Sequence, residues 1–298
     1  MDSASLKFGV MAFNWEPFSY HLDLYEKIAV SAEEMGFDSF FVSDHFLRPF
    51  LGVEPHLVKR HATIEAYTLL SYIAAKTQTI RLGTCVTPLA MRNPAILAKT
   101  VSTLDNLSNG RFIFGAGTGD YETEFEAYGS YGLHKRVSKS IEAVQLMKRL
   151  WTEDVTDFSG EFFNVKGAVL EPKPVQRPNP PIWFGALHER MFRVTAELSD
   201  GWMPASSLGA TPEFYEKNSR LIKSIAKPGK KITMSLMGYV VKDPSTSPLP
   251  PLGTEHEIGK VLEQYRVAGC EHVVAAFLPV EEYLDSMKKF CAEIVPSF

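Results

Sequence analysis

The sequence predicts an α/β fold of the (β/α)8 or TIM-barrel type, in which eight parallel strands alternate with eight helices. Short apolar segments alternate with amphipathic helical segments along the chain. The chain has 298 residues, and a barrel of this type commonly uses about 250 residues as a single domain. The composition, 45% hydrophobic and 22% charged, is typical of a globular protein with a sizeable core.

Eight segments have the composition of strands buried in a parallel sheet. They are short, mostly apolar and rich in β-branched or aromatic residues, as strands covered on both faces should be. The segments are Lys7–Ala12, Ser39–Ser43, Ile80–Val86, Phe112–Ala116, Pro181–Gly185, Gly201–Pro204, Ile232–Val241 and His272–Phe277. Eight such units joined by right-handed crossovers are what a closed barrel requires.

Helix boundaries can be recognised between these strands. An apolar stripe over residues 22–35 ends at Gly36, as expected where a helix stops. Asn93 and Thr211 each precede a proline, which predicts an N-cap followed by proline in the first helical position. Thr254, with a glutamate three residues later, predicts a capping box.

Two insertions depart from the minimal barrel, after strand 2 and before strand 5. Residues 46–62 form a loop too long for a simple connection, and we expect it to cover the pocket because loops at the carboxyl ends of barrel strands build active sites. Residues 153–180 hold a predicted hairpin around Ser159 and Gly160, followed by a proline-rich crossing. The sequence has no linker or internal repeat, so residues 1–298 are predicted to form one domain.

Charge and cysteine content argue against several classes of partner. The net charge is −4 without an extended basic cluster, which argues against nucleic acid and anionic membranes. The apolar runs are too short to span a membrane. Three widely spaced cysteines predict a cytoplasmic protein without a disulfide framework. His56 and His61 are five residues apart, which fits no helical zinc motif, so no metal site is predicted.

The most informative motif lies in residues 110–120. An apolar run leads to glycines at positions 115, 117 and 119, followed by Asp120. Glycines at a strand end let backbone N–H groups approach a ligand closely, which indicates a floor for a flat or anionic cofactor. The alternative is a Rossmann dinucleotide fingerprint. That fingerprint requires G-x-G-x-x-G spacing, and the acidic residues that follow here would repel phosphate.

Polar or small residues at other strand ends are further candidates. Asp44 and His45 follow the second strand, and histidine is the side chain best suited to transfer a proton near neutral pH. The structural alternative has His45 bonded to a carbonyl and Asp44 capping the next segment. Residues 83–88 predict a tight bulge against a ligand. Gly185 and Ala186 lead into a helix N-terminus, where phosphate is favoured.

Together these motifs resemble the luciferase-like monooxygenase superfamily and, within it, the branch that uses the deazaflavin coenzyme F420. The resemblance covers essentially the whole chain. It is carried by the segments Gly36–Phe46, Arg81–Val86, Arg92–Lys99, Leu104–Phe112, Gly115–Asp120 and Asp200–Trp202. It implies a barrel with the cofactor in its mouth, usually assembled as a homodimer.

The resemblance also implies residue roles. His45 would serve the substrate as acid or base, and Asp44 would contact the cofactor ring or orient the imidazole. The Cys85–Val86 bond matches a position where relatives carry a non-prolyl cis peptide that presses a bulge against the ring. The implied cofactor contacts are Asp44, Thr84, Cys85, Val86, Thr118 and Gly119 at the ring, with Gly185 and Ala186 near the phosphate-bearing tail.

Two departures from the family pattern argue against a phosphosugar substrate. Asp120, a third catalytic candidate, stands where the sugar-phosphate dehydrogenases of the branch carry glutamate. Their phosphate-binding lysine has no counterpart in residues 205–209. Glu65 resembles a glutamate found near the pocket of relatives, and its alternative is the solvated face of a helix. Trp15 and other aromatic residues near the predicted mouth indicate a carbon-rich substrate, or equally a dimer interface or helix packing.

Three functions remain open at this point. The first is an F420-dependent oxidoreductase that transfers a hydride between the cofactor and an alcohol, carbonyl, C=C or C=N substrate, with His45 managing a proton. The second is an FMN-dependent monooxygenase of the same fold. The third is a non-catalytic flavin-binding barrel, against which the Asp44–His45 pair argues because binding alone needs no proton-transfer group.

Overall fold

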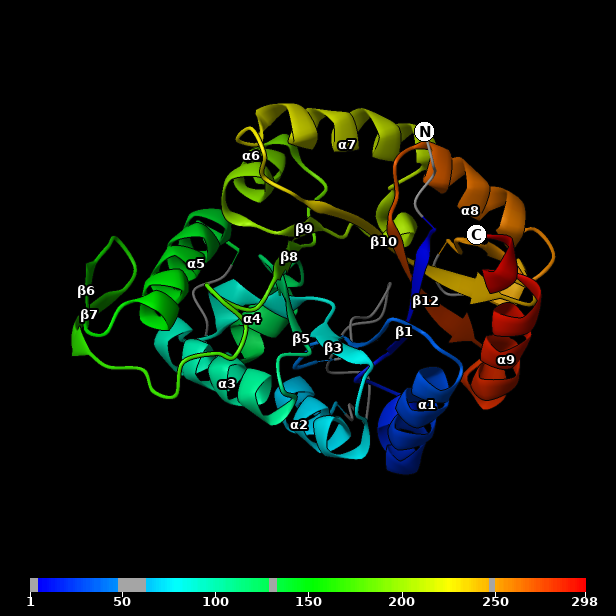
Figure 1. Ribbon diagram of the computed structural model, residues 1–298, viewed down its shortest axis with the longest axis horizontal. Helices are drawn as coiled ribbons and strands as arrows, with labels where there is room; N and C mark the ends of the chain where they lie inside the picture. The colour runs from blue at the N-terminus through cyan, green and yellow to red at the C-terminus, as the bar shows by residue number, and fades with distance from the viewer. Residues whose placement is uncertain (1–4, 48–62, 129–132, 247–249) are drawn as a thin grey trace. The chain divides into compact units, whose positions relative to one another are not determined.

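The computed structural model describes residues 5–47, 63–128, 133–246 and 250–298. Along these residues the eight expected strands are parallel and alternate with helices, which confirms the (β/α)8 fold (Figure 1). Internal contacts divide the chain into two compact units. The first comprises Met1–Ala12, His21–Phe41 and Trp183–Phe298, and the second comprises Phe13–Tyr20 and Val42–Ile182. The single domain stays a prediction.

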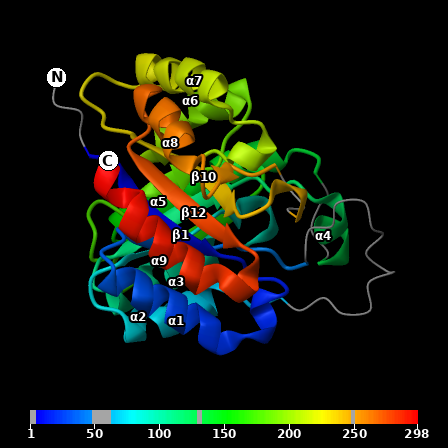
Figure 2. The same ribbon diagram turned by 90° about the vertical axis from the view of Figure 1, so that its right-hand side faces the viewer.

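The first unit is built on a parallel sheet. Its strands are β1 (Lys7–Ala12), β9 (Gly201–Trp202), β10 (Thr233–Val241), β11 (Gly253–Thr254) and β12 (His272–Leu278), with most of β2 (Ser39–Val42) and β8 (Ile182–Phe184). Strand β12 pairs with β1 and β10, β10 also pairs with β9, and β9 pairs with β8. In Figure 2 the helix α9 (Tyr283–Glu293) lies against the outer face of β12, which it contacts.

The helices of this unit confirm most of the predicted boundaries. They are α1 (Leu22–Glu34), α6 (Glu189–Leu198), α7 (Pro212–Ile225), α8 (Ile258–Val267) and α9. Thr211 caps α7 by accepting a hydrogen bond from the N–H of Phe214. The capping box at Thr254 is wrong, because its hydroxyl bonds to the carboxylate of Glu257 (3.1 Å) and α8 has no side-chain cap.

The second unit holds the strands β3 (Arg81–Thr84), β4 (Thr87–Pro88) and β5 (Phe112–Gly117). Both β3 and β4 pair with β5, so the predicted third strand is interrupted at residues 85–86. The accompanying helices are α2 (Ala66–Lys76), α3 (Pro94–Leu107), α4 (Glu122–Ala127) and α5 (Arg136–Thr152). Asn93 caps α3 as expected. Helix α3 packs against both α2 and α5 (Figure 1).

The insertion before strand 5 forms the predicted hairpin, with β6 (Thr156–Ser159) antiparallel to β7 (Asn164–Ala168). The Glu142 carboxylate on α5 anchors its turn by accepting the backbone N–H groups of residues 161–163. Of the insertion after strand 2, residues 48–62 lie outside the described part of the chain, so its place over a pocket stays a prediction.

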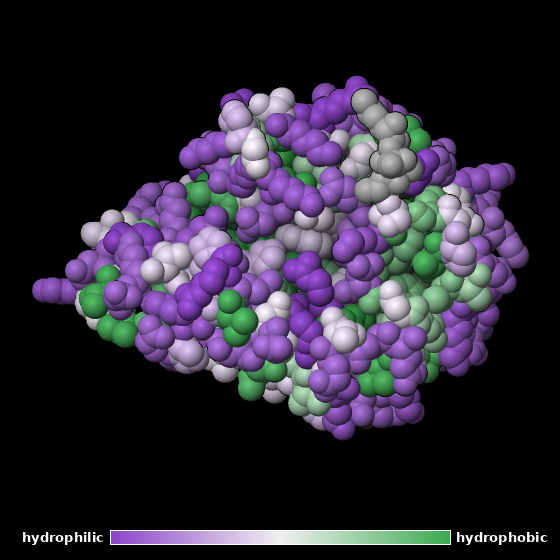
Figure 3. Space-filling view, in the orientation of Figure 1, coloured by the Kyte–Doolittle hydropathy of each residue, from purple (hydrophilic) through white to green (hydrophobic). Residues whose placement is uncertain are grey.

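The face of the molecule in Figure 3 is covered mainly by hydrophilic residues, with hydrophobic residues in separate patches. The exposed large apolar side chains of the described residues lie on several helices and loops, which is ordinary for a folded protein. Within the described residues, no helix combines the length and the apolar character needed to cross a membrane.

Candidate functional site

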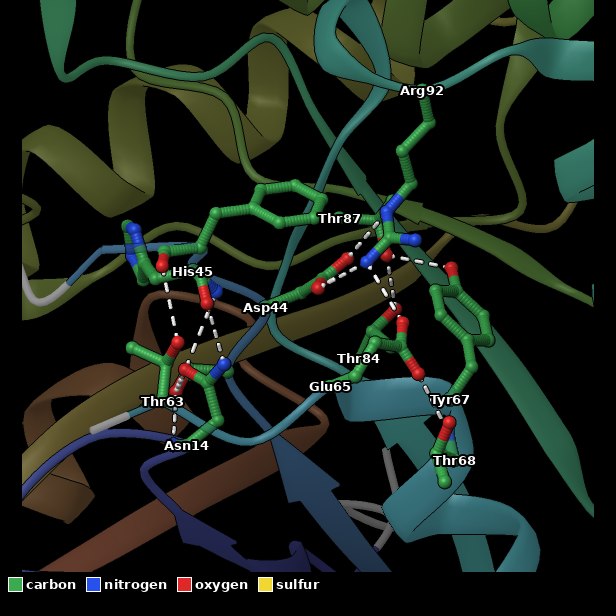
Figure 4. A network of polar contacts seen from close by, with 12 residues as sticks. Asn14, Asp44, His45, Thr63, Glu65, Tyr67, Thr68, Thr84, Thr87 and Arg92 are labelled. Carbon is green, nitrogen blue, oxygen red and sulfur yellow. Dashed lines mark hydrogen bonds and ion pairs between the residues drawn. The ribbon is translucent and has the colours of Figure 1, made fainter. Parts of the chain in front are cut away.

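Asn14 joins three backbone segments beneath the candidate site (Figure 4). Its amide nitrogen donates to the carbonyls of His45 (2.7 Å) and Ile64 (2.9 Å), and its amide oxygen accepts from the hydroxyl of Ser43 (2.9 Å). The side chain is fully buried, so these bonds are shielded from water. The residue was missed in the sequence, where its only signal is a polar residue that ends an apolar run.

Asn14 thus holds the backbone of His45. About a fifth of the surface of the His45 side chain is exposed (22%). The rings of Trp15 and Tyr121 approach it edge-to-face, with centroids at 5.2 and 5.6 Å. Nδ1 lies 3.3 Å from a carboxylate oxygen of Glu124 on α4. The structure therefore brings together the predicted residues His45 and Trp15, and adds two residues that sequence reasoning missed.

Glu124 is the carboxylate that contacts the histidine ring. Asp44 was expected either to orient the imidazole or to contact the cofactor ring, and its contact with the cofactor ring stays a prediction. Glu124 is almost fully buried (2% exposed), and its other oxygen accepts the backbone N–H groups of Phe46 and Leu47 (3.0 Å for Leu47). The sequence shows it only as one member of an acidic run, in which nothing distinguishes a buried carboxylate from solvated ones.

Asp44 is instead bound by Arg92 (Figure 4). The guanidinium donates to both carboxylate oxygens, at 2.6 and 3.1 Å. Its carbon Cζ lies over the rings of Phe46 and Tyr67, at 4.8 and 5.0 Å from their centroids. Burial raises the pKa of the Asp44 carboxyl, and the charge of Arg92 opposes that rise. Although burial works against it, the carboxylate of Asp44 raises the pKa of Arg92, which stays charged.

Glu65 begins helix α2. One of its oxygens accepts the N–H of Thr68 (2.7 Å) as an N-cap, and the other accepts a hydrogen bond from Arg92 (3.0 Å). Burial alone would raise the pKa of Glu65, but these hydrogen bonds and the charge of Arg92 lower it. The Glu65 side chain is nevertheless 42% exposed, and its contact with substrate stays a prediction.

The bulge after β3 presses against the glycines of β5. The Cys85–Val86 peptide is cis, as the resemblance implies. A Cβ on Gly115 would lie 1.6 Å from the carbonyl oxygen of Thr84, and one on Gly117 would lie 2.5 Å from Val86. These two glycines therefore leave room for the neighbouring bulge, whereas the sequence pattern predicts room for a ligand.

Thr84 and Cys85 are residues of the bulge region that are predicted to contact the cofactor, and their surroundings differ. Thr84 is fully buried, and its hydroxyl donates to the carbonyl of Gly115 (2.9 Å), so it ties β3 to β5. Cys85 is half-buried, and burial raises the pKa of its thiol to about 12. A thiol that holds its proton at neutral pH is a poor nucleophile.

The segment after β5 turns sharply at Gly119, whose φ is +77°. A Cβ there would lie 2.7 Å from the ring of Phe125, so glycine lets α4 fold back onto the strand end. Asp120 follows with an exposed side chain. Partial desolvation raises its pKa, the charge of Glu124 adds to the rise, and His45 opposes it.

The exposure pattern fits a flat ligand at these strand ends. Within otherwise buried segments, exposure returns at Cys85 and Val86 and again at Thr118 and Gly119, all four half-buried. Exposed backbone and small side chains at these positions suit the face of a planar ring. Gly185 and Ala186 follow β8 in the first unit, where Ala186 accepts a hydrogen bond from the indole of Trp202 (2.9 Å). Their place near a phosphate stays a prediction.

A metal site requires several ligand side chains close together. Among the described residues, no three His, Cys, Asp or Glu side chains are arranged to hold a metal ion. His56 and His61 lie outside the described residues.

Comparisons with known proteins place this geometry in context. The profile of the family described as luciferase-like monooxygenase matches residues 10–246. An F420-dependent glucose-6-phosphate dehydrogenase of Kineococcus radiotolerans is 36% identical over 183 residues, which are 61% of this chain and 52% of that protein. The chain thus spans about half the length of the curated relatives it matches.

Two solved structures have a similar fold. One is an F420-dependent secondary alcohol dehydrogenase in complex with an F420-acetone adduct, with a TM-score of 0.78 and 21% identity over 98% of this chain and 99% of that one. The other is a monooxygenase from Streptomyces bottropensis, with a TM-score of 0.79 and 22% identity over the same shares. At these identities the likeness shows the fold alone.

Proposed function

The chain belongs to the luciferase-like monooxygenase family, and from this premise we propose that it is an F420-dependent oxidoreductase. It transfers a hydride between the deazaflavin and a small organic substrate, with His45 as acid or base. The proposal is supported by the F420-dependent relative and by the fold shared with an F420-dependent alcohol dehydrogenase.

The observation that carries the proposal is the setting of His45. Its ring is packed between two aromatic edges and contacts a buried carboxylate through Nδ1, while part of its surface remains open. An imidazole held in one orientation with one nitrogen paired is the arrangement expected of a group that exchanges protons. In alcohol oxidation Nε2 would take the hydroxyl proton, and in carbonyl reduction it would return one.

When bound, F420 supplies the ring carbon that accepts or donates the hydride. The half-buried residues Cys85, Val86, Thr118 and Gly119 would contact the ring face. Asp44 acts on the site indirectly, because Arg92 occupies both of its oxygens. The chain's part in this chemistry is to bind, orient and manage one proton.

The proposed substrate is a small alcohol, carbonyl compound, alkene or imine rather than a phosphosugar. The glucose-6-phosphate of the relative is not carried over, because residues 205–209 lack a lysine and Asp120 replaces glutamate. Trp15 places an aromatic wall beside His45, which suits an apolar substrate. Asp120, whose pKa is raised by desolvation and lowered in part by His45, is a second candidate acid.

His45→Ala tests the assignment. Turnover of F420 with a panel of secondary alcohols and ketones should fall by about 10²–10⁴-fold, the usual range for loss of a general acid or base. The affinity for F420 should change little, because His45 is assigned to the substrate. His21→Ala, an exposed histidine, is the matched control. Near-normal turnover of His45→Ala would remove the assignment.

A further inference from the structure

The acidic residues of α4 have different environments. Glu122 and Glu126 are exposed, whereas Glu124 is buried beneath the segment that follows His45. Burying a carboxylate is unfavourable unless hydrogen bonds compensate it. Glu124 receives these hydrogen bonds from Phe46 and Leu47, which are far away in the sequence. Its position is therefore specified by the tertiary fold and not by helix α4 alone.

The two oxygens of Glu124 have separate partners. Oε1 accepts the backbone N–H groups of Phe46 and Leu47, which fixes the plane of the carboxylate. Oε2 is thereby directed at Nδ1 of His45, 3.3 Å away. The close packing of Phe125 on Gly119 holds the helix in this place. The contact is therefore preorganised by backbone bonds and by apolar packing.

We infer that Glu124 is a positioning residue for His45, which keeps the neutral imidazole in the tautomer that has its proton on Nδ1. A carboxylate accepts hydrogen bonds and does not donate them, so the ring nitrogen facing it must carry the proton. The lone pair then lies on Nε2, where it can take a proton from substrate. The effect on turnover rests on the proposed function, whereas the tautomer does not.

The other groups around the imidazole act in different ways. Trp15 and Tyr121 present ring edges, which pack against the imidazole. Asp120 interacts with it through charge. Glu124 is the carboxylate at hydrogen-bond distance from a ring nitrogen in the described part of the site.

The variant Glu124→Gln replaces the carboxylate by an amide of nearly the same size, and so tests the carboxylate without changing the packing. The amide oxygen can still accept from the N–H groups of Phe46 and Leu47, which leaves the amide NH2 facing Nδ1 of His45. Because that group donates, Nδ1 must become the acceptor and the ring proton moves to Nε2. Glu126→Gln makes the same change of charge on the same helix at an exposed position, and is the matched control.

The test is ¹⁵N NMR of the histidine rings in the cofactor-free protein, with the His45 signals assigned by their loss in His45→Ala. In the wild type and in Glu126→Gln, the signal of a protonated nitrogen should belong to Nδ1. In Glu124→Gln it should belong to Nε2. A wild-type His45 protonated on Nε2 overturns the inference, even if the variant fails to fold.

Kinetics give a second readout. Glu124→Gln should lower kcat by roughly 10²-fold or more, with KM and the dissociation constant of F420 changed less than about twofold, because only the proton-transfer step is affected. A shift of tautomer without any F420-linked turnover in the wild type would refute the proposed function and leave the positioning role standing. Unchanged kcat with a shifted tautomer would show that the tautomer has no catalytic role.

Discussion

Arg92 binds the buried carboxylate of Asp44 through two parallel hydrogen bonds, from Nη2 to Oδ1 at 2.6 Å and from Nε to Oδ2 at 3.1 Å. The same guanidinium reaches Glu65, the N-cap of α2. One side chain before α3 therefore connects the end of β2 to the start of the next helix. Asp44, the residue before His45, therefore binds Arg92. The carboxylate that contacts the His45 ring is that of Glu124 on α4.

Arg92→Ala should destabilise the protein by about 3–5 kcal/mol, because it leaves the carboxylate of Asp44 buried without its partner. The double variant with Asp44→Asn should recover part of this loss. Denaturant unfolding measures both effects. Arg193→Ala, which breaks an exposed ion pair with Glu189, is the control and should cost less than about 1 kcal/mol. A loss for Arg92→Ala no larger than that of the control would contradict the assigned role.

Gly115→Ala should destabilise the protein by at least about 3 kcal/mol, since the new methyl group would overlap the carbonyl oxygen of Thr84 and the rigid bulge cannot yield easily. Gly259→Ala is the control, because its Cβ would meet only Ile294 at 3.8 Å in the first turn of α8. That change should be neutral or slightly stabilising. Thermal unfolding of the two variants distinguishes them, and equal melting temperatures would disprove the close approach.

Asn14→Asp should lower stability by about 1–3 kcal/mol for each carbonyl that loses its donor, because an ionised carboxylate cannot donate to His45 and Ile64. It should also lower turnover, since His45 loses its backbone anchor. Asn164→Asp on the exposed hairpin is the matched control. Urea unfolding followed by fluorescence compares the stability of the two variants. Equal stability would show that the bonds from Asn14 to the two carbonyls do not stabilise the protein.

Asp120 gives a pH prediction. Desolvation raises the pKa of Asp120 in the folded chain above its ordinary value of 3.8, so the folded state binds its proton more tightly than the unfolded state does. Unfolding releases that proton in the window above 3.8, and the contribution of Asp120 to stability therefore falls as pH rises through its folded pKa. Asp120→Asn removes this contribution. The stability of the variant relative to wild type should rise with pH across this window and then level off. Melting temperatures from pH 4 to 7 test it, and a constant or falling difference would refute it.

Much of the fold could be predicted because its signals are local. Apolar runs such as 272–277 and the proline after Asn93 specify strands and helix starts without reference to the rest of the chain. The predicted third strand is interrupted because residues 85–86 form the bulge, which is decided by contact with β5. The cap at Thr254 failed because its hydroxyl bonds to the Glu257 side chain in place of a backbone N–H.

The site was predicted only in part, for a physical reason. His45 and Asp44 are adjacent in sequence, which favoured pairing them, but successive residues at a strand end point in different directions. The partners that orient them, Glu124 and Arg92, come from other segments and are specified by tertiary packing. Likewise, the sequence pattern predicts that Gly115 leaves room for a ligand. In the structure it leaves room for the carbonyl of Thr84 on β3.

The most direct test of the account is a parallel titration of the purified chain with F420 and with FMN, followed by oxygen consumption and by the absorbance of each cofactor during turnover. The account predicts that F420 binds at micromolar concentration or tighter, that it is reduced by an alcohol or reoxidised by a carbonyl compound, and that oxygen is not consumed. Tight retention of FMN with oxygen consumption, and no binding of F420, would contradict it.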